Sequence, residues 1–327
     1  MGIYNCSLLG YGYYVPETIL TNAQLETMMD TSDEWIVSRT GIKERRIAAR
    51  EQTASDLGSL AARKAIAAAG IQAADLDLII TATITGDYIW PATACRIQDK
   101  LGLHGIPAFD ISAACTGFIY GLNMARGLIA SGSYKNILLV CTEKFSAGLN
   151  WQDRNVSVLF ADGAGAVVLG RSADEGVLAS ALFADGSKSD LLLQPGGGSC
   201  KPISAELVAS GQHYLQMNGK EVYMHAVSKM PQALDAVLSQ AGLAVEQLDH
   251  LVFHQANLRI IQAIVQRYRL PADKVVVNLD RYGNTSAATI PIALAESLES
   301  RRIKRGDLVG VAAFGGGFTW GAAIIRI

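Results

Sequence analysis

The chain has 327 residues, enough for two domains of ordinary size or for one large layered unit with a sizeable core. Its formal net charge of −2 gives no overall positive field that would attract nucleic acid or an anionic membrane. Hydrophobic residues make up 50% of the chain, but they come in short runs, and none reaches the roughly 18 residues of a membrane span. The composition therefore predicts a globular protein with neither nucleic acid nor a membrane as partner.

The start of the chain and its cysteines bear on the cellular compartment. The first residues, Met-Gly-Ile-Tyr-Asn-Cys-Ser, lack the basic and apolar regions of a secretory signal, so we expect a cytoplasmic location. The five cysteines are odd in number and include no Cys-x-x-Cys pair. This pattern argues against a disulfide framework and against a zinc site, so we expect reduced thiols and no metal.

The first predicted elements alternate between helix and strand. Thr31 and Glu34 have the spacing of a capping box, which predicts the start of a surface helix. Residues 51–69 have helical spacing rich in alanine and leucine and end just before Gly70. The apolar run at residues 78–80 then predicts a buried strand. This alternation, which continues along the chain, predicts a mixed α/β fold.

Cys115 is the first candidate catalytic residue. It lies in the run Ile-Ser-Ala-Ala-Cys-Thr-Gly-Phe, which opens an apolar helical stretch. The positive end of a helix dipole and the free N–H groups beside it favour a thiolate, the nucleophilic form of cysteine. Because most free cysteines are simply buried in the core, Cys115 needs partners elsewhere in the chain to count as a nucleophile.

The second half of the chain resembles the first. The pattern of helix, glycine and strand at residues 69–80 recurs at residues 241–252, so that Gly242 takes the place of Gly70. Two further pairs of apolar runs lie at offsets similar to that between these glycines, at residues 106–110 with 275–280 and 137–140 with 308–311. Repetition at this long period predicts a duplicated domain rather than a solenoid, and we place the two halves at residues 1–173 and 174–327.

His254 and Asn284 lie at the strand ends of the second half. His254 follows the apolar run at residues 251–253, and Asn284 lies in Tyr-Gly-Asn-Thr-Ser. Binding sites in α/β folds occupy such strand ends, although a hydrogen-bonded core histidine and a helix-capping asparagine are the simpler interpretations. Gly315–Gly317 lack side chains and allow close approach of a ligand to the backbone, or else form a tight turn.

Together these segments resemble the β-ketoacyl-acyl carrier protein synthase III family. The resemblance covers nearly the whole chain and includes Cys115, His254, Asn284 and Gly315–Gly317, with the further motifs Asp-Gly-Ala-Gly-Ala at residues 162–166 and Met-Asn-Gly at residues 217–219. It implies a thiolase fold, in which two pseudo-symmetric halves with mixed five-stranded sheets form an α-β-α-β-α arrangement. It also implies a homodimer.

The resemblance implies a two-step condensation that initiates fatty acid synthesis. Cys115 would take the acyl group of a short-chain acyl-CoA as a thioester, and malonyl-acyl carrier protein would then lose CO2 and attack it. His254 and Asn284 would stabilise the enolate of the malonyl group, and the N–H groups of Cys115 and Gly316 would form a second oxyanion hole. The products would be 3-ketoacyl-acyl carrier protein, CoA and CO2, with no cofactor because acyl-CoA is a substrate.

Binding roles also follow from the resemblance. Trp35 would stack on one face of the CoA adenine, and Arg154 would cover the other face of the adenine. Thr31 and Arg39 would lie near the nucleotide, and Asn257 would contact the pantetheine arm. The acyl carrier protein would contact the segment formed by Gln255, Ala256, Asn257, Leu258 and Arg259. Three more basic residues could extend this surface or belong to an ordinary solvated face, namely Arg267, Arg269 and Lys274.

The sequence departs from the family at two positions. Met224 stands where the family often has a basic residue, which leaves the details of the carrier footprint open. Trp90 stands where the family commonly has a phenylalanine that reaches across the dimer and closes the acyl pocket. A larger ring would shorten the pocket or swing aside, and one methylene is worth only about 1–3 kcal/mol, so the acyl preference stays open.

Other functions compete with this interpretation. A condensing enzyme or acyltransferase of secondary metabolism would keep the fold and change the acyl-CoA or the acceptor. A non-catalytic acyl-binding or carrier-binding module is disfavoured because all three reactive residues are present. A Cys-His hydrolase would need a water and an orienting group for its base, whereas the resemblance places Asn284 beside the malonyl group.

Overall fold

The computed structural model describes residues 4–173 and 176–327. Within the first of these ranges the chain forms a five-stranded mixed sheet with the strand order β1-β7-β6-β4-β5. Its strands are β1 (Asn5–Tyr14), β4 (Leu78–Ala82), β5 (Ala108–Ile111), β6 (Asn136–Lys144) and β7 (Asp162–Ser172). β4 pairs in parallel with β5 and β6, whereas β7 is antiparallel to β6 and β1. β4 and β6 are buried on both faces, as expected for inner strands that helices cover on two sides.

Residues 176–327 form a second mixed sheet, in which four strands are regular and have the order β11-β12-β13-β8. These strands are β8 (Val177–Ala184), β11 (His250–Phe253), β12 (Leu308–Gly315) and β13 (Thr319–Arg326). β11 and β12 are parallel, and the other two pairs are antiparallel. The sheet therefore repeats the mixed pattern of the first one.

The fifth strand expected at residues 275–280 pairs with its neighbour only through an isolated bridge between Val275 and Leu251. The side chain of Gln255 explains this difference. Its amide nitrogen donates to the carbonyl of Val276 (3.1 Å), and its amide oxygen accepts from the backbone nitrogen of Asn278 (3.1 Å). The side chain thus makes the bonds that a longer β11 would make, and the second sheet has four regular strands instead of the expected five.

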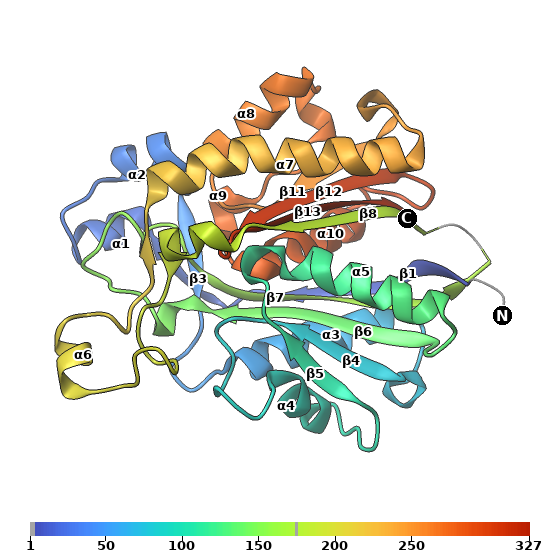
Figure 1. Cartoon of the computed structure of the whole chain (residues 1–327), viewed down its shortest axis with the longest axis horizontal. Helices are drawn as coiled ribbons and strands as arrows, with labels where there is room; N and C mark the ends of the chain where they lie inside the picture. The colour runs from blue at the N-terminus through green and yellow to red at the C-terminus, as the bar shows by residue number, and fades with distance from the viewer. Residues whose placement is uncertain (1–3, 174–175) are drawn as a thin grey trace.

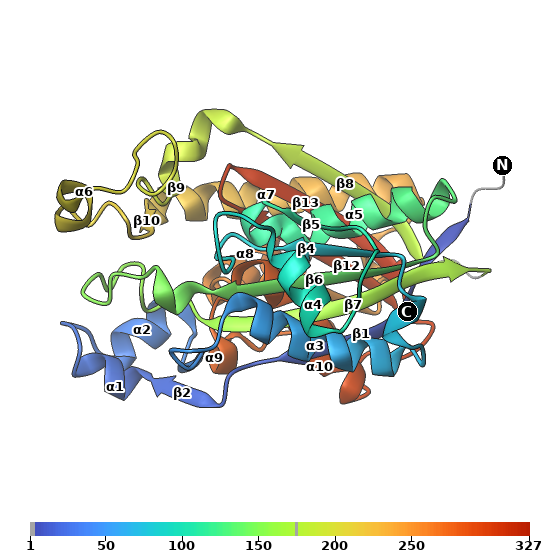
Figure 2. The ribbon, with the colours of Figure 1, turned by 90° about the horizontal axis from the view of Figure 1, so that it is seen from below.

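Helices form three layers around the two sheets, as Figures 1 and 2 show. α5 (Gly117–Ala130) and α10 (Thr289–Glu299) pack between the sheets. One outer layer covers the first sheet and contains α3 (Ala54–Ala68) and α4 (Thr93–Lys100). The other covers the second sheet and contains α7 (Gly219–Ala241) and α8 (Leu258–Tyr268). This α-β-α-β-α arrangement confirms the predicted thiolase fold.

The remaining elements are short and lie mostly at one end of the layers (Figure 1). Helices and strands among them are β2 (Thr18–Thr21), α1 (Asn22–Glu26), α2 (Asp33–Thr40), β3 (Glu44–Ile47), β9 (Leu192–Leu193), α6 (Ala205–Ala209), β10 (Gln216–Met217) and α9 (Leu279–Tyr282). Short 3₁₀ turns are η1 (Ala73–Asp75), η2 (Ala114–Thr116), η3 (Phe145–Ala147), η4 (Gly186–Leu191), η5 (Val245–Gln247), η6 (Ala272–Lys274) and η7 (Ser286–Ala288).

The duplication predicted from the sequence is visible element by element. The offset between Gly70 and Gly242 also separates the first residues of η1 and η5, β4 and β11, η2 and η7, α5 and α10, and β6 and β12. Backbone conformation follows the same rule, because Ala114 (φ 45°) and Ser286 (φ 51°) both have positive φ. The expected boundary between residues 173 and 174 falls at the gap in the described chain and so lies outside the described residues.

A buried arginine fastens the segment of residues 18–47 to the rest of the fold. Arg45 is fully buried, and its guanidinium donates to the Asn22 side chain (2.8 Å) and to the carbonyls of Leu20 and Val158 (both 3.0 Å). Burial lowers the pKa of Arg45 to about 10. These bonds hold the segment with α1 and α2 against the rest of the first half, and α2 carries Trp35 and Arg39.

α2 starts one residue later than the sequence suggested. Its N-cap is Ser32, whose hydroxyl accepts from the backbone nitrogen of Trp35 (3.1 Å). The expected capping box of Thr31 and Glu34 is therefore wrong, because Ser32 has the extended backbone of an N-cap residue and a hydroxyl that serves the same purpose.

The two 3₁₀ turns η2 and η7 meet between the sheets. Gly117, at the start of α5, has no room for a side chain, since a Cβ there would lie 2.8 Å from the Cβ of Ala82 and 3.1 Å from that of Ala287. Gly127, in the same helix, has no atom within 4 Å of the corresponding position. Close approach of the halves thus depends on a glycine at residue 117 but not at residue 127.

These two glycines give a matched test of that packing. Gly117→Ala should lower the free energy of unfolding by about 1–3 kcal/mol, because Ala82 and Ala287 must move apart. Gly127→Ala should raise it by about 0.4–1 kcal/mol by restricting the unfolded chain. Chemical denaturation of both variants and the wild type measures the difference, and equal effects of the two substitutions would contradict the close approach.

Candidate active site

Cys115 lies in η2, at the N-terminal end of α5, as the sequence predicted. Its exposed fraction is only 6%. Burial is the largest influence on this thiol and raises its pKa to about 12, against the lowering effect of the nearby Ser286 hydroxyl. Burial therefore works against the thiolate that the helix N-terminus favours, and at this pKa the neutral thiol predominates.

His254 follows β11 and is buried beside η7. Its backbone nitrogen donates to the carbonyl of Ala312 (2.9 Å), which continues the parallel pairing of β11 with β12. Burial lowers the pKa of His254 to about 3, so the imidazole is neutral at physiological pH. Its Nδ1 lies 2.7 Å from the Thr289 hydroxyl, which leaves Nε2 as the ring nitrogen for a ligand.

Asn284 lies between α9 and η7 and is held by the first half of the chain. Its backbone nitrogen donates to the carbonyl of Leu159, and its own carbonyl accepts from Ala161 (both 2.9 Å). The side-chain oxygen accepts from the backbone nitrogen of Ser286 (2.8 Å). This bond fixes the amide orientation and leaves its NH2 group to donate to a ligand.

One cavity of about 890 Å³ brings these three residues together. Cys115, His254 and Asn284 all line it, although they come from three separate turns. Other predicted site residues on its wall are Trp35, Arg39, Arg154, Ala256, Asn257 and Arg259. The structure thus gathers a thiol, a neutral imidazole and an oriented amide in one buried site, as nucleophilic catalysis with oxyanion stabilisation requires.

The glycine-rich turn between β12 and β13 lies against the nucleophile. A Cβ on Gly315 would lie 2.7 Å from the backbone nitrogen of Cys115, which excludes any other residue there without displacement. Gly316 is next to η2, since its Cβ would lie 3.7 Å from that of Ala114. The backbone N–H of Gly316 as an oxyanion donor remains a prediction.

The expected adenine site is closed. The guanidinium carbons of Arg39 and Arg154 lie 4.8 and 5.0 Å from the centroid of the Trp35 ring, within cation-π distance. Arg154 also donates to the carbonyl of Asp30 (2.6 Å). An adenine between Trp35 and Arg154 would have to displace that arginine. Thr31 does not line the cavity, and its buried hydroxyl has no hydrogen-bond partner among the described residues.

The segment expected to meet a carrier protein divides into buried and accessible residues. Gln255 is buried and bonded to the residue 275–280 segment, so the structure gives it a structural role instead of the expected surface contact. Ala256 and Leu258 are half-buried, and Arg259 is exposed. Asn257 caps α8, because its side chain accepts from the backbone nitrogen of Arg259 (2.9 Å).

The other basic residues near α8 are mostly engaged elsewhere. Arg267 lies 3.7 Å from a carboxylate oxygen of Asp235, and the Lys274 ammonium donates to the carbonyls of Glu246 and Leu248. Arg269 is exposed and ends α8 with a left-handed conformation. The interpretation of these positions as an ordinary solvated face therefore gains support.

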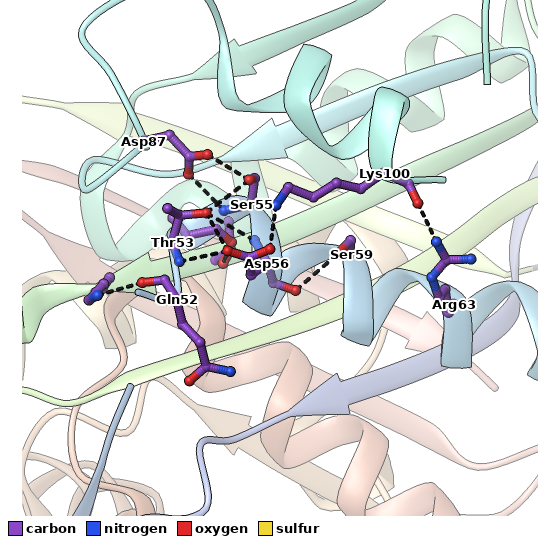
Figure 3. A network of polar contacts seen from close by, with 11 residues as sticks. Gln52, Thr53, Ser55, Asp56, Ser59, Arg63, Asp87 and Lys100 are labelled. Atoms are coloured by element: carbon purple, nitrogen blue, oxygen red, sulfur yellow. Dashed lines mark hydrogen bonds and ion pairs between the residues drawn. The ribbon is translucent and has the colours of Figure 1, made fainter. Parts of the chain in front are cut away.

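Trp90 lies on an exposed loop and does not line the cavity of its own chain. Tyr88, Ile89 and Trp90 are 62%, 88% and 83% exposed, a run of large apolar side chains without cover. The base of this loop is fastened to α3, because the Asp87 carboxylate accepts from the backbone nitrogen (2.8 Å) and hydroxyl (2.6 Å) of Ser55, as Figure 3 shows. The loop is thus held in a fixed place while its tip faces outward.

Sequence reasoning missed three polar residues around the catalytic set. Thr289 contacts His254, and Ser286 and Glu143 are buried near Cys115. The internal repeat carried a signal for two of them. At the offset of the repeat, Ser286 corresponds to Ala114 and Glu143 corresponds to Gly315, so both occupy positions equivalent to parts of the predicted site.

Among residues 4–173 and 176–327, no helix is long and apolar enough to cross a membrane. In the same part of the chain, no three His, Cys, Asp or Glu side chains are placed to hold a metal ion.

Comparison with known proteins connects this geometry to a family. Residues 109–186 match the family model described as 3-oxoacyl-[acyl-carrier-protein] synthase III, and residues 238–327 match the model of its C-terminal part. Curated relatives named β-ketoacyl-[acyl-carrier-protein] synthase III include one from Roseiflexus castenholzii, with 49% identity over 98% of this chain and 97% of that protein. Another, from Symbiobacterium thermophilum, is 51% identical over 100% of this chain and 99% of its own.

Solved structures agree with the sequence comparison. The crystal structure of 3-oxoacyl-[acyl-carrier-protein] synthase III from Aquifex aeolicus superposes with a TM-score of 0.92. It is 45% identical in sequence, and the match covers 99% of this chain and 100% of that one. With identity near one half over almost the entire length, the chain belongs to the 3-oxoacyl-[acyl-carrier-protein] synthase III family.

Proposed function

We propose that this protein condenses a short-chain acyl-CoA, with acetyl-CoA as the first candidate, with malonyl-acyl carrier protein. The observation that carries the proposal is the single cavity lined by Cys115, His254 and Asn284 in a chain of this family. The products are 3-ketoacyl-acyl carrier protein, CoA and CO2, and the reaction initiates fatty acid synthesis. No cofactor is needed, because acyl-CoA is itself a substrate.

The first half-reaction transfers the acyl group to the enzyme. The Cys115 sulfur bonds to the thioester carbon of acyl-CoA, and the bond from that carbon to the CoA sulfur breaks. The tetrahedral intermediate places negative charge on oxygen, which the backbone N–H groups of Cys115 and Gly316 stabilise. Covalent capture divides the condensation into two steps and gives ping-pong kinetics.

The second half-reaction forms the carbon–carbon bond. Malonyl-acyl carrier protein loses CO2, and the enolate oxygen that develops accepts hydrogen bonds from Asn284 Nδ2 and His254 Nε2. The donor role of His254 requires the tautomer with hydrogen on Nε2. In that tautomer the Thr289 hydroxyl donates to Nδ1 (2.7 Å) in place of the Ser286 carbonyl, which lies 3.0 Å from the same hydroxyl. The enolate carbon then attacks the acyl carbon, and Cys115 leaves as a thiolate.

Binding of CoA involves Trp35, Arg39, Arg154, Asn257 and Thr31 in this proposal. Arg154 leaves its place over Trp35 when adenine enters, since the two cannot occupy that face together. Displacement of Arg154 from Trp35 costs little free energy, because its ion-pair partner Asp30 is exposed and surface ion pairs contribute little stability.

The partner surfaces are the carrier site and a dimer interface. Ala256, Asn257 and Arg259 present the accessible part of the carrier segment at the cavity, with the half-buried Leu258 between them in sequence and the buried Gln255 before them. The exposed apolar run of residues 88–90 supports a homodimer in which Trp90 reaches the acyl pocket of the partner. Neither nucleic acid nor a membrane has a part in the proposal. In this proposal the boundary between the two halves along the chain lies between residues 173 and 174.

Intact-mass measurement of Cys115 acylation across a panel of CoA thioesters tests the first half-reaction. Wild-type protein should gain the acyl group of short thioesters, and the preferred length separates acetyl-CoA from the substrates of a secondary-metabolism relative. Cys115→Ser should lower condensation roughly 1,000-fold, equivalent to about 4 kcal/mol, because an alcohol is a much weaker nucleophile than a thiol. Condensation by the serine variant at the wild-type rate would contradict the covalent mechanism.

The donors of the second half-reaction have a different signature. His254→Ala and Asn284→Ala should each slow CO2 release from malonyl-acyl carrier protein about 10²–10³-fold, while acylation of Cys115 falls less than tenfold. Single-turnover assays starting from the acyl-enzyme separate the two steps. An equal loss of both steps would argue against this division of roles. Because burial holds the pKa of His254 near 3, the wild-type second step should show no acid limb near pH 6.5.

Arg259 and Arg267 provide a matched pair for the carrier surface. Arg259→Glu should raise the KM for malonyl-acyl carrier protein about tenfold without changing the KM for acyl-CoA, because it reverses a charge at the cavity mouth. Arg267 lies farther along α8, so Arg267→Glu should leave the KM values for malonyl-acyl carrier protein and for acyl-CoA unchanged within about twofold. Steady-state kinetics with each substrate varied in turn measures both KM values. A similar increase in the KM for malonyl-acyl carrier protein in both variants would contradict a specific role of Arg259.

A further inference from the structure

The acylation half-reaction must remove a proton from a buried thiol. Burial raises the pKa of Cys115 to about 12, so the resting sulfur carries its proton. His254 is a poor acceptor for this proton, because burial also disfavours the imidazolium and lowers its pKa to about 3. The catalytic set therefore contains a nucleophile that needs a base and no group suited to that task.

Glu143 is a buried carboxyl group that the reaction described so far does not use. It lies near the end of β6 with an exposed fraction of 0%. One oxygen, Oε2, accepts from the hydroxyls of Thr83 (3.3 Å) and Thr85 (2.5 Å) and from the backbone nitrogens of Ile84 (3.2 Å) and Thr85 (3.1 Å). The other oxygen, Oε1, is buried and has no hydrogen-bond partner among the described residues.

Ser286 lies between this carboxyl group and the nucleophile. The η7 turn that carries it packs against both η2 and β6. The Ser286 hydroxyl is buried and makes no bond of full hydrogen-bond geometry within the described chain, yet it is close enough to lower the pKa of both Cys115 and Glu143 by hydrogen bonding. Two buried oxygens without a hydrogen-bond partner among the described residues, Ser286 Oγ and Glu143 Oε1, thus lie where η7 packs against β6 and against η2, the turn that carries Cys115.

The charges around Glu143 favour one shared proton. Burial raises the pKa of Glu143 to about 7, and no lysine or arginine is among the groups with the largest effects on it. Among the described residues, the thiols of Cys115 and Cys141 sense this charge, which raises the pKa of both. Cys141 stays protonated because burial raises its pKa well above the ordinary value. Repulsion between a thiolate and a carboxylate keeps one proton on the pair of Cys115 and Glu143.

We propose that Glu143, reached through the hydroxyl of Ser286, accepts the Cys115 proton during acylation. As the sulfur bonds to the acyl carbon, its proton passes to Ser286 Oγ, and the Ser286 proton passes to Oε1 of Glu143. When the bond from carbon to the CoA sulfur breaks, the CoA thiolate takes one proton back over the same hydroxyl. The step ends with acyl-Cys115, CoA thiol and ionised Glu143.

The rest of the cycle balances with one proton from solvent. Condensation releases Cys115 as a thiolate beside the ionised carboxylate, and the pair then takes up the proton that the departed CoA carried away. This sequence rests on the proposed function, because acyl-CoA is its acyl donor. The second half-reaction itself needs no proton from Glu143, which makes the two steps separable by experiment.

Glu143→Gln tests the inference, because glutamine keeps the shape of the side chain and loses its basicity. Acylation of Cys115 by acetyl-CoA should be about 100-fold slower. Condensation from enzyme acylated by prolonged incubation should not be slower, since that step needs no base and the loss of the negative charge favours departure of the Cys115 thiolate. A purely electrostatic role predicts the opposite sign, because removal of the negative charge lowers the pKa of Cys115 and speeds acylation. Acylation as fast as or faster than that of the wild type would overturn the proposal.

The pH profile gives a second readout on the same proteins. Wild-type acylation should fall as the pH drops through about 7, because a protonated Glu143 cannot accept the proton. This acid limb should be missing from the residual activity of Glu143→Gln. Persistence of the limb in the variant would assign it to another group and overturn the role of Glu143.

Ser286→Ala and Cys141→Ala complete the set of variants. Ser286→Ala removes the hydroxyl between Cys115 and Glu143 without changing a charge. Alanine can adopt the backbone conformation of residue 286, because Ala114 adopts it at the equivalent position. This variant therefore tests the proton path if Glu143→Gln fails to fold. It should reproduce the slow acylation, and a wild-type rate would overturn the proposal. Cys141→Ala is the control beside the same carboxylate, and a rate within about twofold of the wild type supports a specific path.

Failure of this inference and failure of the proposed function give different results. Wild-type protein is first assayed for 3-ketoacyl product from acetyl-CoA and malonyl-acyl carrier protein. Absence of that product would contradict the proposed function, and the proton path with it. Product from the wild type together with unchanged acylation by Glu143→Gln would overturn the proton path alone.

Discussion

The active site depends on the close packing of two 3₁₀ turns between the sheets. η2 carries Cys115 and η7 follows Asn284, and Gly117 allows them to approach because a side chain there would collide with Ala82 and Ala287. Both turns contain a residue with positive φ, Ala114 in one and Ser286 in the other, which directs the chain into the following helix. Cys115 and Asn284 thus meet because α5 and α10, the equivalent helices of the two halves, start at the same place in the middle layer.

Burial of Cys115 and His254 determines their protonation states. Burial raises the pKa of Cys115 and lowers that of His254, so both groups are neutral before substrate arrives. A neutral imidazole and an amide suit the stabilisation of an enolate, because they donate hydrogen bonds without the desolvation cost of an ion. The same burial makes deprotonation of Cys115 harder. Burial therefore favours the second half-reaction, which needs neutral donors, and disfavours the first, which needs a thiolate.

The sequence predicted most of the fold, and it named three residues that the fold gathers in one cavity, for identifiable reasons. The repeat is readable because Gly70 and Gly242 both end helices and precede buried runs. Gln255 could not be assigned correctly, since only the fold shows that its side chain bonds the segment at residues 275–280. Likewise, Arg154 over Trp35 and the exposed loop at Trp90 depend on distances and solvent contact that no local pattern contains.

The duplication also explains how equivalent positions in the two halves acquired different uses. Glu143 lies at the end of β6 and Gly315 at the end of β12, at places that the repeat makes equivalent. A Cβ at Gly315 would lie 2.7 Å from the Cys115 nitrogen, so the second half needs glycine there and contributes backbone only. The first half accommodates a carboxylate at the same place, which Thr83 and Thr85 hold by hydrogen bonds. The space beside Cys115 therefore differs between the two halves. At Gly315 there is no space for a side chain, whereas at Glu143 there is space for a carboxyl group that can hold a proton.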